Sequence, residues 1–294
     1  MSFGIALSGG GVRGAAHVGV VCALEEAGLF PRSVAGSSAG SIVAGLYGMG
    51  MTGKELKSLV DDLAVNGYGL IDADYLGLLK AGRQFLCRKP ITFSGLIKGK
   101  RLEDYLFWLT KGIRMDQLER RTVIPAVDLI SGLTVAYTND LRHLEPLKDV
   151  SWQTGVRLSF AMRASCAVPA VFQPKSTGEM CLVDGGVTDL LPVNLLLAAG
   201  EKNVLAIDLA RNYHGADCNH IMEIASHSLS VMSRRLSECA SVGEKLLLKP
   251  SLPKGAELLA FNKMKDCMAA GYEATVALLP QIKEIFAETV KEEP

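Results

Sequence analysis

The first fifty residues of the chain constrain its fold most, because short apolar runs alternate there with helical patterns. Residues 3–7 and 33–37 are runs of small and apolar residues, the kind that form buried strands. Helical patterns follow over residues 15–27 and 39–47, and glycines occupy both junctions. Strand, helix, strand and helix with short connections predict a parallel sheet covered by helices, which is the α/β class.

The rest of the chain is consistent with a single α/β domain of 294 residues. No Pro/Ser-rich linker, charge block or internal repeat divides it. We expect residues 52–121 to form a helical cap inserted into this domain, and C-terminal helices to occupy residues 218–292. The other segments expected are strands at 123–127, 134–137, 181–183 and 204–207, and helices at 152–163, 193–199, 218–242 and 265–290.

The charge balance argues against some classes of partner. Lys+Arg and Asp+Glu number 31 each, which gives no electrostatic reason to expect nucleic acid and no polybasic patch for anionic lipid. Contact with a membrane surface would have to come from apolar residues around a site. The N-terminus lacks a basic region before its apolar run, and no apolar stretch is long enough to span a bilayer. We therefore expect a cytoplasmic protein; its oligomeric state is left open.

The cysteines point to a reducing compartment. Seven are scattered along the chain, an odd number, and no two form a C-x-x-C pair. This pattern argues against a disulfide framework and against a zinc ribbon. No other cluster with metal-ligand spacing is visible, so we expect neither a metal nor a cofactor.

A glycine-rich loop occupies residues 9–14, between the first strand and the first helix. Glycines allow successive N–H groups to line one concavity, and the following helix N-terminus adds positive potential, so the loop suits an anion. Its G-x-G-x-x-G spacing also matches the dinucleotide-binding fingerprint, but that motif requires an acid at the end of the second strand. Residues 33–37 contain no acid, and Glu25 and Glu26 lie in the preceding helix. A purely structural turn is the third interpretation.

Residues 36–40 read G-S-S-A-G and satisfy the G-x-S-x-G pattern of a nucleophile elbow. In that motif the central serine, here Ser38, occupies a strained turn where side chains on the flanking residues would collide with the backbone. Ser37 and Ser41 lie beside it without holding the central position. The alternative is a serine that caps the following helix in a tight turn.

A serine nucleophile needs a base, and the best candidate is Asp184. It follows the strand at 181–183 and precedes two glycines, which suits ligand contact at the C-terminal end of a strand; the alternative is an ordinary Asp-Gly turn. No histidine sits in a catalytic motif, although one lies about one turn beyond the glycine loop. The five histidines are His17, His143, His214, His220 and His227.

Together and in this order, residues 9–14, 36–40 and 184–186 resemble the motifs of the patatin-like phospholipase family, G-G-G-x-R/K-G, G-x-S-x-G and D-G-G/A. Residues 14–20 and 164–172 add to the similarity, which covers about residues 3–210. One departure is visible. The family often has N-x-P after D-G-G, whereas Leu190 stands here in place of the asparagine, which affects local polar packing.

The resemblance implies a three-layer α/β/α fold with a central, mostly parallel sheet. It also implies a lipid acyl hydrolase of the phospholipase A, lysophospholipase or esterase type, which works with a Ser–Asp dyad and no histidine. In this sequence the dyad would be Ser38 and Asp184. Arg13 would steady the glycine loop or bind a phosphate headgroup. Backbone N–H groups of the loop would form the oxyanion hole, and the residues concerned are Gly10, Gly11 and Val12.

Two other functions remain open from the sequence. A conventional α/β-hydrolase has its triad in the order Ser, Asp, His, and three histidines follow Asp184 in that order. A nucleotide-binding regulatory protein would use the glycine loop and would have no use for Ser38. The position of the glycine loop, directly after the first strand, favours the patatin-like arrangement.

Overall fold

The computed structural model describes residues 2–209, 224, 228–229, 231–233, 235–236 and 243–288. The described strands are β1 (Gly4–Leu7), β2 (Ser33–Gly36), β3 (Gly95–Ile97), β4 (Arg121–Asp128), β5 (Thr134–Thr138), β6 (Val150–Gln153), β7 (Ala170–Phe172), β8 (Lys175–Ser176), β9 (Cys181–Asp184), β10 (Val204–Ile207) and β11 (Leu246–Leu248). The described α-helices are α1 (Ala15–Glu26), α2 (Ala39–Gly48), α3 (Gly53–Asn66), α4 (Tyr75–Leu86), α5 (Lys100–Leu109), α6 (Leu158–Ser165), α7 (Val193–Ala198) and α9 (Met264–Glu288).

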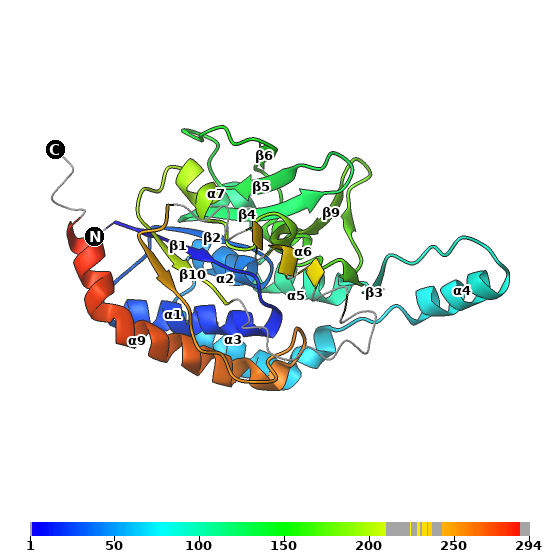
Figure 1. Ribbon diagram of the computed structural model, residues 1–294, viewed down its shortest axis with the longest axis horizontal. Helices are drawn as coiled ribbons and strands as arrows, with labels where there is room; N and C mark the ends of the chain where they lie inside the picture. Colours follow the sequence, from blue (N-terminus) through cyan, green and yellow to red (C-terminus); the bar gives the residue numbers. More distant parts are fainter. Residues whose placement is uncertain are drawn as a thin grey trace.

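A mixed sheet runs through the centre of the molecule (Figure 1). Its strands follow the order β11-β10-β1-β2-β4-β5-β6, with β9 paired to β4 and β8 paired to β9. Neighbours from β11 to β4 are parallel, as are β5 and β6, whereas β5 and β9 both run antiparallel to β4. The predicted α/β class with a mostly parallel central sheet is therefore confirmed.

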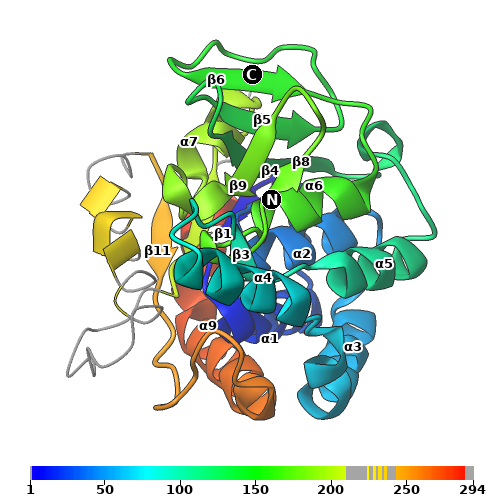
Figure 2. The same ribbon diagram turned by 90° about the vertical axis from the view of Figure 1, so that its right-hand side faces the viewer.

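Helices cover both faces of this sheet (Figure 2). Successive side chains of a strand point to opposite faces, so Ile5 and Leu7 of β1 pack among α1, α2 and α9, while Ala6 packs on the side of α7. At the start of β1, Phe3 stacks on Phe286 of α9 with 4.8 Å between ring centroids. The three-layer arrangement predicted from the resemblance is present.

One predicted helix begins later than expected. The pattern over residues 152–163 was interpreted as a helix, but residues 150–153 form β6 and pair with β5. Gly155 then takes a positive φ of 75°, and α6 begins at Leu158. The helix expected at 265–290 is α9, whereas most of the one expected at 218–242 lies outside the described residues.

Residues 52–121, expected to form one cap, contain helices with different surroundings. Helix α3 packs against α1, and α5 packs against α6. Between them α4 has no buried residue and projects from the rest of the molecule (Figure 1). We call residues 75–94 the arm; its base is closed by a bridge between Ala73 and Ile97. Among the described helices, none combines the length and the apolar character needed to cross a bilayer.

Candidate active site

Ser38 occupies a strained turn between β2 and α2. Its φ of 52° and ψ of −125° lie in a region that non-glycine residues rarely adopt. The glycines on either side are required by close packing. A Cβ on Gly36 would lie 2.1 Å from the carbonyl oxygen of Gly40, and a Cβ on Gly40 would lie 2.5 Å from that of Leu7. The G-x-S-x-G pattern therefore has the steric basis of a nucleophile elbow.

The C-terminal end of α6 holds the strained backbone in place. The Ser38 N–H donates a 3.0 Å hydrogen bond to the Ser165 hydroxyl, and the Cys166 thiol donates to the Ser38 carbonyl at 3.2 Å. Burial raises the pKa of Cys166 to about 12, so this thiol stays a neutral donor. This contact joins residues 127 positions apart, so it leaves no local pattern in the sequence beyond the family similarity of residues 164–172.

The sheet register brings Asp184 to the same level as Ser38. Asp184 pairs with Ala126 of β4, three residues beyond Val123, which is the partner of Ala35 in β2. Ser38 also lies three residues beyond Ala35. Since β5 occupies one edge of β4, β2 and β9 pair with successive stretches of its other edge, and the end of β9 therefore meets the turn after β2. Two residues 146 positions apart in the sequence thus become neighbours.

Asp184 is nearly enclosed, with 5% of its surface exposed. One carboxylate oxygen, Oδ1, accepts a 2.7 Å hydrogen bond from the Gly186 N–H, whereas Oδ2 has no hydrogen-bond partner among the described residues. Burial raises the pKa of Asp184 to about 6, against the opposing influence of the Ser38 hydroxyl and the Gly186 N–H. The Ser38 hydroxyl therefore acts on the Asp184 carboxyl as a neighbouring hydrogen-bond donor.

The glycine loop lies against this pair. A side chain on Gly9 would come within 3.2 Å of the Ser38 Cβ. Its own N–H donates to the Leu190 carbonyl at 3.0 Å, and the Val12 N–H donates to the Leu258 carbonyl at 3.2 Å. The N–H groups of Gly10 and Gly11 have no acceptor among the described residues. Two of the three predicted oxyanion donors are therefore unoccupied, and the third is engaged by Leu258, which the sequence analysis did not consider.

The half-buried Arg13 is bonded to the loop itself. Its Nε donates to the Gly10 carbonyl at 3.0 Å, and Nη1 donates to the Leu209 carbonyl at 3.2 Å. In a trans peptide the C=O and the following N–H point in opposite directions. By fixing the Gly10 carbonyl, Arg13 therefore also fixes the direction of the Gly11 N–H. Of the two roles weighed for Arg13, these contacts match the steadying of the loop.

Leu190, the departure from the family pattern, lies between the two halves of the site. A side chain on Gly9 would approach its Cδ1 to 2.9 Å, and one on Gly186 would approach the same atom to 3.2 Å. A methyl group therefore fills the space between the glycine loop and the turn that follows Asp184. It adds to the apolar surroundings that raise the pKa of that carboxyl.

An apolar cavity of about 170 Å³ has Ser38 in its wall. The glycine loop lines it beside Ser38, and aliphatic residues of four helices complete it. These include Val18 of α1, Ile42, Val43 and Leu46 of α2, Leu56, Leu59, Val60 and Leu63 of α3, and Leu102, Leu106 and Leu109 of α5. Such a cavity suits a hydrocarbon chain whose polar end reaches the serine.

The described histidines lie away from this pair. His17 is fully buried outside the cavity, with Nε2 2.8 Å from the Ser8 carbonyl oxygen, and burial lowers its pKa to about 4. His143 is exposed in a loop. His214, His220 and His227 lie outside the described residues, so the structure does not place them.

A dinucleotide site would require an acidic residue at the end of β2, and none stands there. The Glu25 carboxylate accepts the N–H of Gly53 at 2.7 Å, at the start of α3. Glu25 thus stabilises a helix N-terminus and does not face the glycine loop.

Comparisons with known proteins agree with this geometry. A family model described as "Patatin-like phospholipase" matches residues 5–197. The uncharacterized protein YqhO of Bacillus subtilis (strain 168) is 32% identical over 217 residues, covering 69% of each chain. Lysophospholipase NTE1 of Mycosarcoma maydis is 30% identical over 217 residues, which cover 71% of this chain and 10% of that protein. The chain spans a third or less of several such relatives.

A solved structure shares the fold. The crystal structure of VipD from Legionella pneumophila superposes with a TM-score of 0.53, at 16% sequence identity, over 95% of this chain and 67% of that one. At this identity the likeness bears on architecture alone.

Proposed function

The chain belongs to the patatin-like phospholipase family, and from that premise we propose that it hydrolyses carboxylic esters of lipids through a Ser38–Asp184 dyad. One observation carries the proposal: a serine on a strained turn lies beside a buried carboxyl and in the wall of an apolar cavity. Lipid hydrolase activity is the property that the family name and a relative named as a lysophospholipase have in common.

In the first half of the reaction, Ser38 Oγ attacks the ester carbonyl carbon while Asp184 accepts the hydroxyl proton. An ordinary aspartate is a weak base for this step, but the raised pKa of Asp184 makes proton transfer less unfavourable. The unpartnered Oδ2 is the acceptor atom best suited to it. Collapse of the tetrahedral intermediate breaks the ester C–O bond, and Asp184 returns the proton to the leaving alcohol.

The oxyanion of that intermediate is held by the glycine loop. The donors are the N–H groups of Gly10 and Gly11, which have no acceptor among the described residues, and Arg13 fixes the direction of the second. Val12 contributes only if its N–H exchanges the Leu258 carbonyl for the oxyanion. The N-terminus of α2, which begins directly after Ser38, adds positive potential.

In the second half, water attacks the acyl-enzyme. Asp184 accepts a proton from that water, the bond between the acyl carbon and Ser38 Oγ breaks, and the serine recovers its proton as the fatty acid leaves. No step requires an oxidant, a metal or a cofactor. The acyl chain occupies the apolar cavity during both halves, which supports a preference for substrates with a hydrocarbon chain over short acetyl esters.

Labelling by a fluorophosphonate, followed by peptide mass spectrometry, tests the nucleophile. We expect one adduct, on Ser38, and neither labelling nor ester hydrolysis in Ser38→Ala. Ser37→Ala is the matched control, because the adjacent Ser37 is also buried and its hydroxyl has no hydrogen-bond partner in the described part of the chain. That variant should keep both labelling and activity.

Two results would overturn the proposal. An adduct on Ser37 or Ser41 in active protein would show that the elbow has been assigned to the wrong residue. Absence of both labelling and hydrolysis across phospholipids, lysophospholipids and p-nitrophenyl esters, with folded protein, would favour a binding module that uses the glycine loop alone.

A further inference from the structure

The arm, residues 75–94, has a composition unlike that of the whole chain. It carries four basic residues and no acidic one, whereas the whole chain has equal numbers of both. The net charge of the whole chain is zero and gives no reason to expect attraction to anionic lipid. The arm is nevertheless a local cationic segment. The basic residues are Lys80, Arg83, Arg88 and Lys89.

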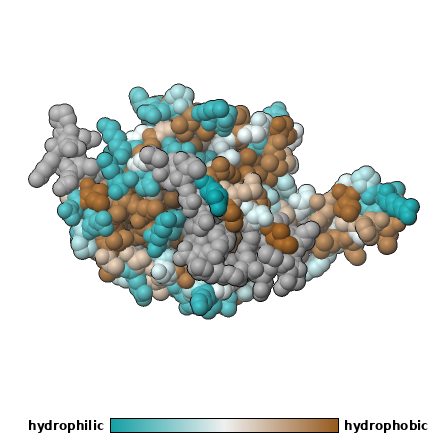
Figure 3. All heavy atoms as spheres, viewed as in Figure 1, coloured by the Kyte–Doolittle hydropathy of each residue, from teal (hydrophilic) through white to brown (hydrophobic). Residues whose placement is uncertain are grey.

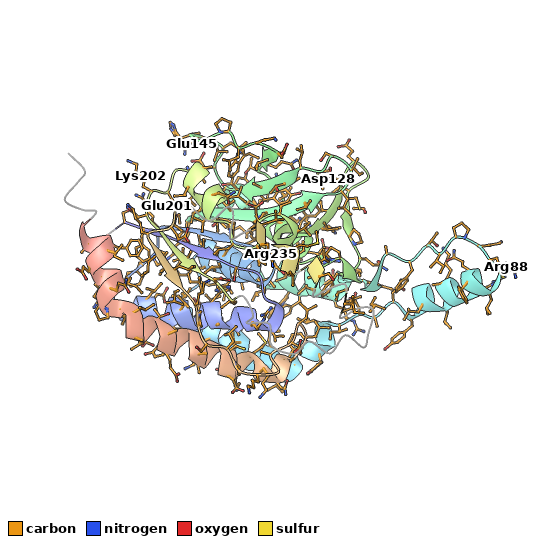
Figure 4. The ribbon with its side chains drawn as sticks, viewed as in Figure 1. Arg88, Asp128, Glu145, Glu201, Lys202 and Arg235 are labelled. Atoms are coloured by element: carbon orange, nitrogen blue, oxygen red, sulfur yellow. The ribbon has the colours of Figure 1, made fainter. Side chains whose placement is uncertain are left out.

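The arm also turns its apolar side chains outward. Gln84 of α4 bonds with Thr92 of the returning chain, with 2.9 Å between its amide oxygen and the Thr92 N–H, so the polar side of the helix faces the arm's own second half. Apolar side chains of α4 remain exposed: Leu79 by 72%, Phe85 by 72% and Leu86 by 82%. Figure 3 shows apolar residues along the arm and hydrophilic residues at its far end, where Figure 4 places Arg88. Exposed apolar surface of this extent, combined with cations, matches what lies in a membrane interface.

The base of the arm is firmly attached beside the cavity. Arg163, which is almost fully buried, donates to the carbonyl of Gly99 at 2.9 Å and to that of Lys98 at 2.9 Å. The Asp72 carboxylate accepts the Gly99 N–H at 2.7 Å. Leu70, which comes just before the arm, and Leu102, which comes just after it, both line the cavity that contains Ser38.

We propose that the arm docks on an anionic lipid bilayer, with the apolar side of α4 in the boundary between headgroups and acyl chains. Its cations then meet lipid phosphates, and the rim of the cavity lies against the membrane from which an acyl chain enters. This inference rests on the proposed lipid hydrolysis for its purpose. The binding itself does not require catalysis, so the two can fail separately.

Vesicle sedimentation with inactive Ser38→Ala protein tests the docking. We expect binding to vesicles of phosphatidylcholine with about one third phosphatidylglycerol to weaken at least about tenfold when Leu79→Ser, Phe85→Ser and Leu86→Ser are combined. Leu129→Ser with Ile130→Ser is the matched control. These side chains are 57% and 68% exposed, at the turn after β4, and their loss should leave binding unchanged.

The charge of the arm is tested with Arg83→Gln and Arg88→Gln. Each should weaken binding to the anionic vesicles by about fivefold, and added salt should reduce the difference. On vesicles of phosphatidylcholine alone the two variants should equal the parent protein.

A second experiment separates the docking from the proposed function. With Ser38 restored, the apolar triple variant should hydrolyse a soluble p-nitrophenyl ester at the parent rate and vesicle lipid more slowly. Equal vesicle binding by the triple variant and its parent would overturn the docking, whatever the catalytic result. A different role for the arm, as a dimer contact, would also overturn the docking. In that case light scattering would show the parent as a dimer and the triple variant as a monomer, and the triple variant would still bind vesicles. Failure of the parent to cleave any ester, with arm-dependent binding retained, would count against the proposed function alone.

Discussion

Helices α1 and α4 are both rich in apolar residues and both twelve residues long, yet they have opposite surroundings. In α1 nine residues are buried, among them Leu24 with none of its surface exposed, and the helix packs against α9 and α3. In α4 none is buried. The helical pattern indicates which residues share a face, and it does not indicate what that face meets. Burial in α1 stabilises the fold, whereas the exposed face of α4 is available to a partner.

The candidate active site lies in a buried region, as α1 does. Ser38, Asp184 and the glycine loop lie in a close-packed framework in which a strained turn is held by Ser165 and Cys166. Substitutions there should alter catalysis strongly, and substitutions on the arm should alter neither catalysis of a soluble ester nor folding.

The largest effect is expected for Asp184→Asn. An amide cannot accept the Ser38 proton, so kcat on a soluble ester should fall by about 10⁴ or more, as it does when a catalytic base is lost elsewhere. The arm variant Leu79→Ser should keep the parent kcat in the same assay. An Asp184→Asn protein that is folded and retains more than about a tenth of the activity would refute its role as base.

The next effect is on stability and compares two leucines. Leu24→Ala should lower the free energy of unfolding by about 2 to 5 kcal/mol, because a fully buried side chain leaves a cavity. Leu79→Ala, at a position 72% exposed, should change it by no more than about 0.5 kcal/mol. Urea unfolding of both variants measures the difference. A large loss at Leu79 would mean that the arm packs against the rest of the protein in solution.

Arg13→Gln should have an intermediate effect on catalysis. Without the bond from Nε to the Gly10 carbonyl, the Gly11 N–H loses its fixed direction, and removal of one oxyanion donor typically costs about 10² to 10³ in kcat. Since the donor is displaced and not deleted, we expect a loss of about ten- to a hundredfold in kcat, with KM nearly unchanged. Arg13→Lys, which can still reach that carbonyl, should recover part of it. An effect on KM alone would instead indicate that Arg13 binds a substrate headgroup.

The sequence was informative where function depends on short, local patterns. The elbow around Ser38 could be predicted because its spacing places glycines at the two positions where a Cβ would collide with neighbouring backbone. The role of Ser165 and the engagement of Val12 by Leu258 could not, because each contact joins segments more than a hundred residues apart.

Elements decided by tertiary packing were also missed. The end of strand β6, residues 152–153, is predicted as the start of a helix, because four residues of alternating character do not reveal a strand without the pairing to β5. The projection of the arm within the predicted cap could not be foreseen, since apolar spacing alone does not show whether α4 has a neighbouring core.

The pH dependence of activity should reflect the enclosed carboxyl. The base must be ionised, and its pKa is raised to about 6, so kcat/KM should fall as pH decreases through about 6 and be lower by about tenfold at pH 5. An exposed aspartate, with a pKa of about 3.9, would keep about nine tenths of the activity at pH 5 and about half at pH 4. Leu190→Asn places a polar amide where a methyl group now lies beside Gly9 and Gly186. In this variant the fall in kcat/KM should occur at lower pH. If kcat/KM falls at the same pH in that variant as in the parent, Leu190 does not control the hydration of the site.

The same pKa shift should appear in stability with a defined sign. A carboxyl whose pKa is higher in the folded than in the unfolded state destabilises the fold once both states are ionised, above about pH 6. Asp184→Asn should therefore raise the free energy of unfolding at pH 8 by about 1 to 3 kcal/mol, and by less at pH 4. The comparison of the two pH values controls for any change in packing.

The smallest effect is expected for the histidines that follow Asp184 in the sequence. If the residues around the cavity suffice for the chemistry, His214→Ala, His220→Ala and His227→Ala should each keep kcat within about tenfold of the parent, as substitutions outside a site usually do. Each variant should be assayed on a soluble ester after circular dichroism has confirmed its fold. One folded histidine variant as inactive as Asp184→Asn would replace the dyad with a Ser–His–Asp triad, and would show that the body of the enzyme is completed by a segment beyond the described residues.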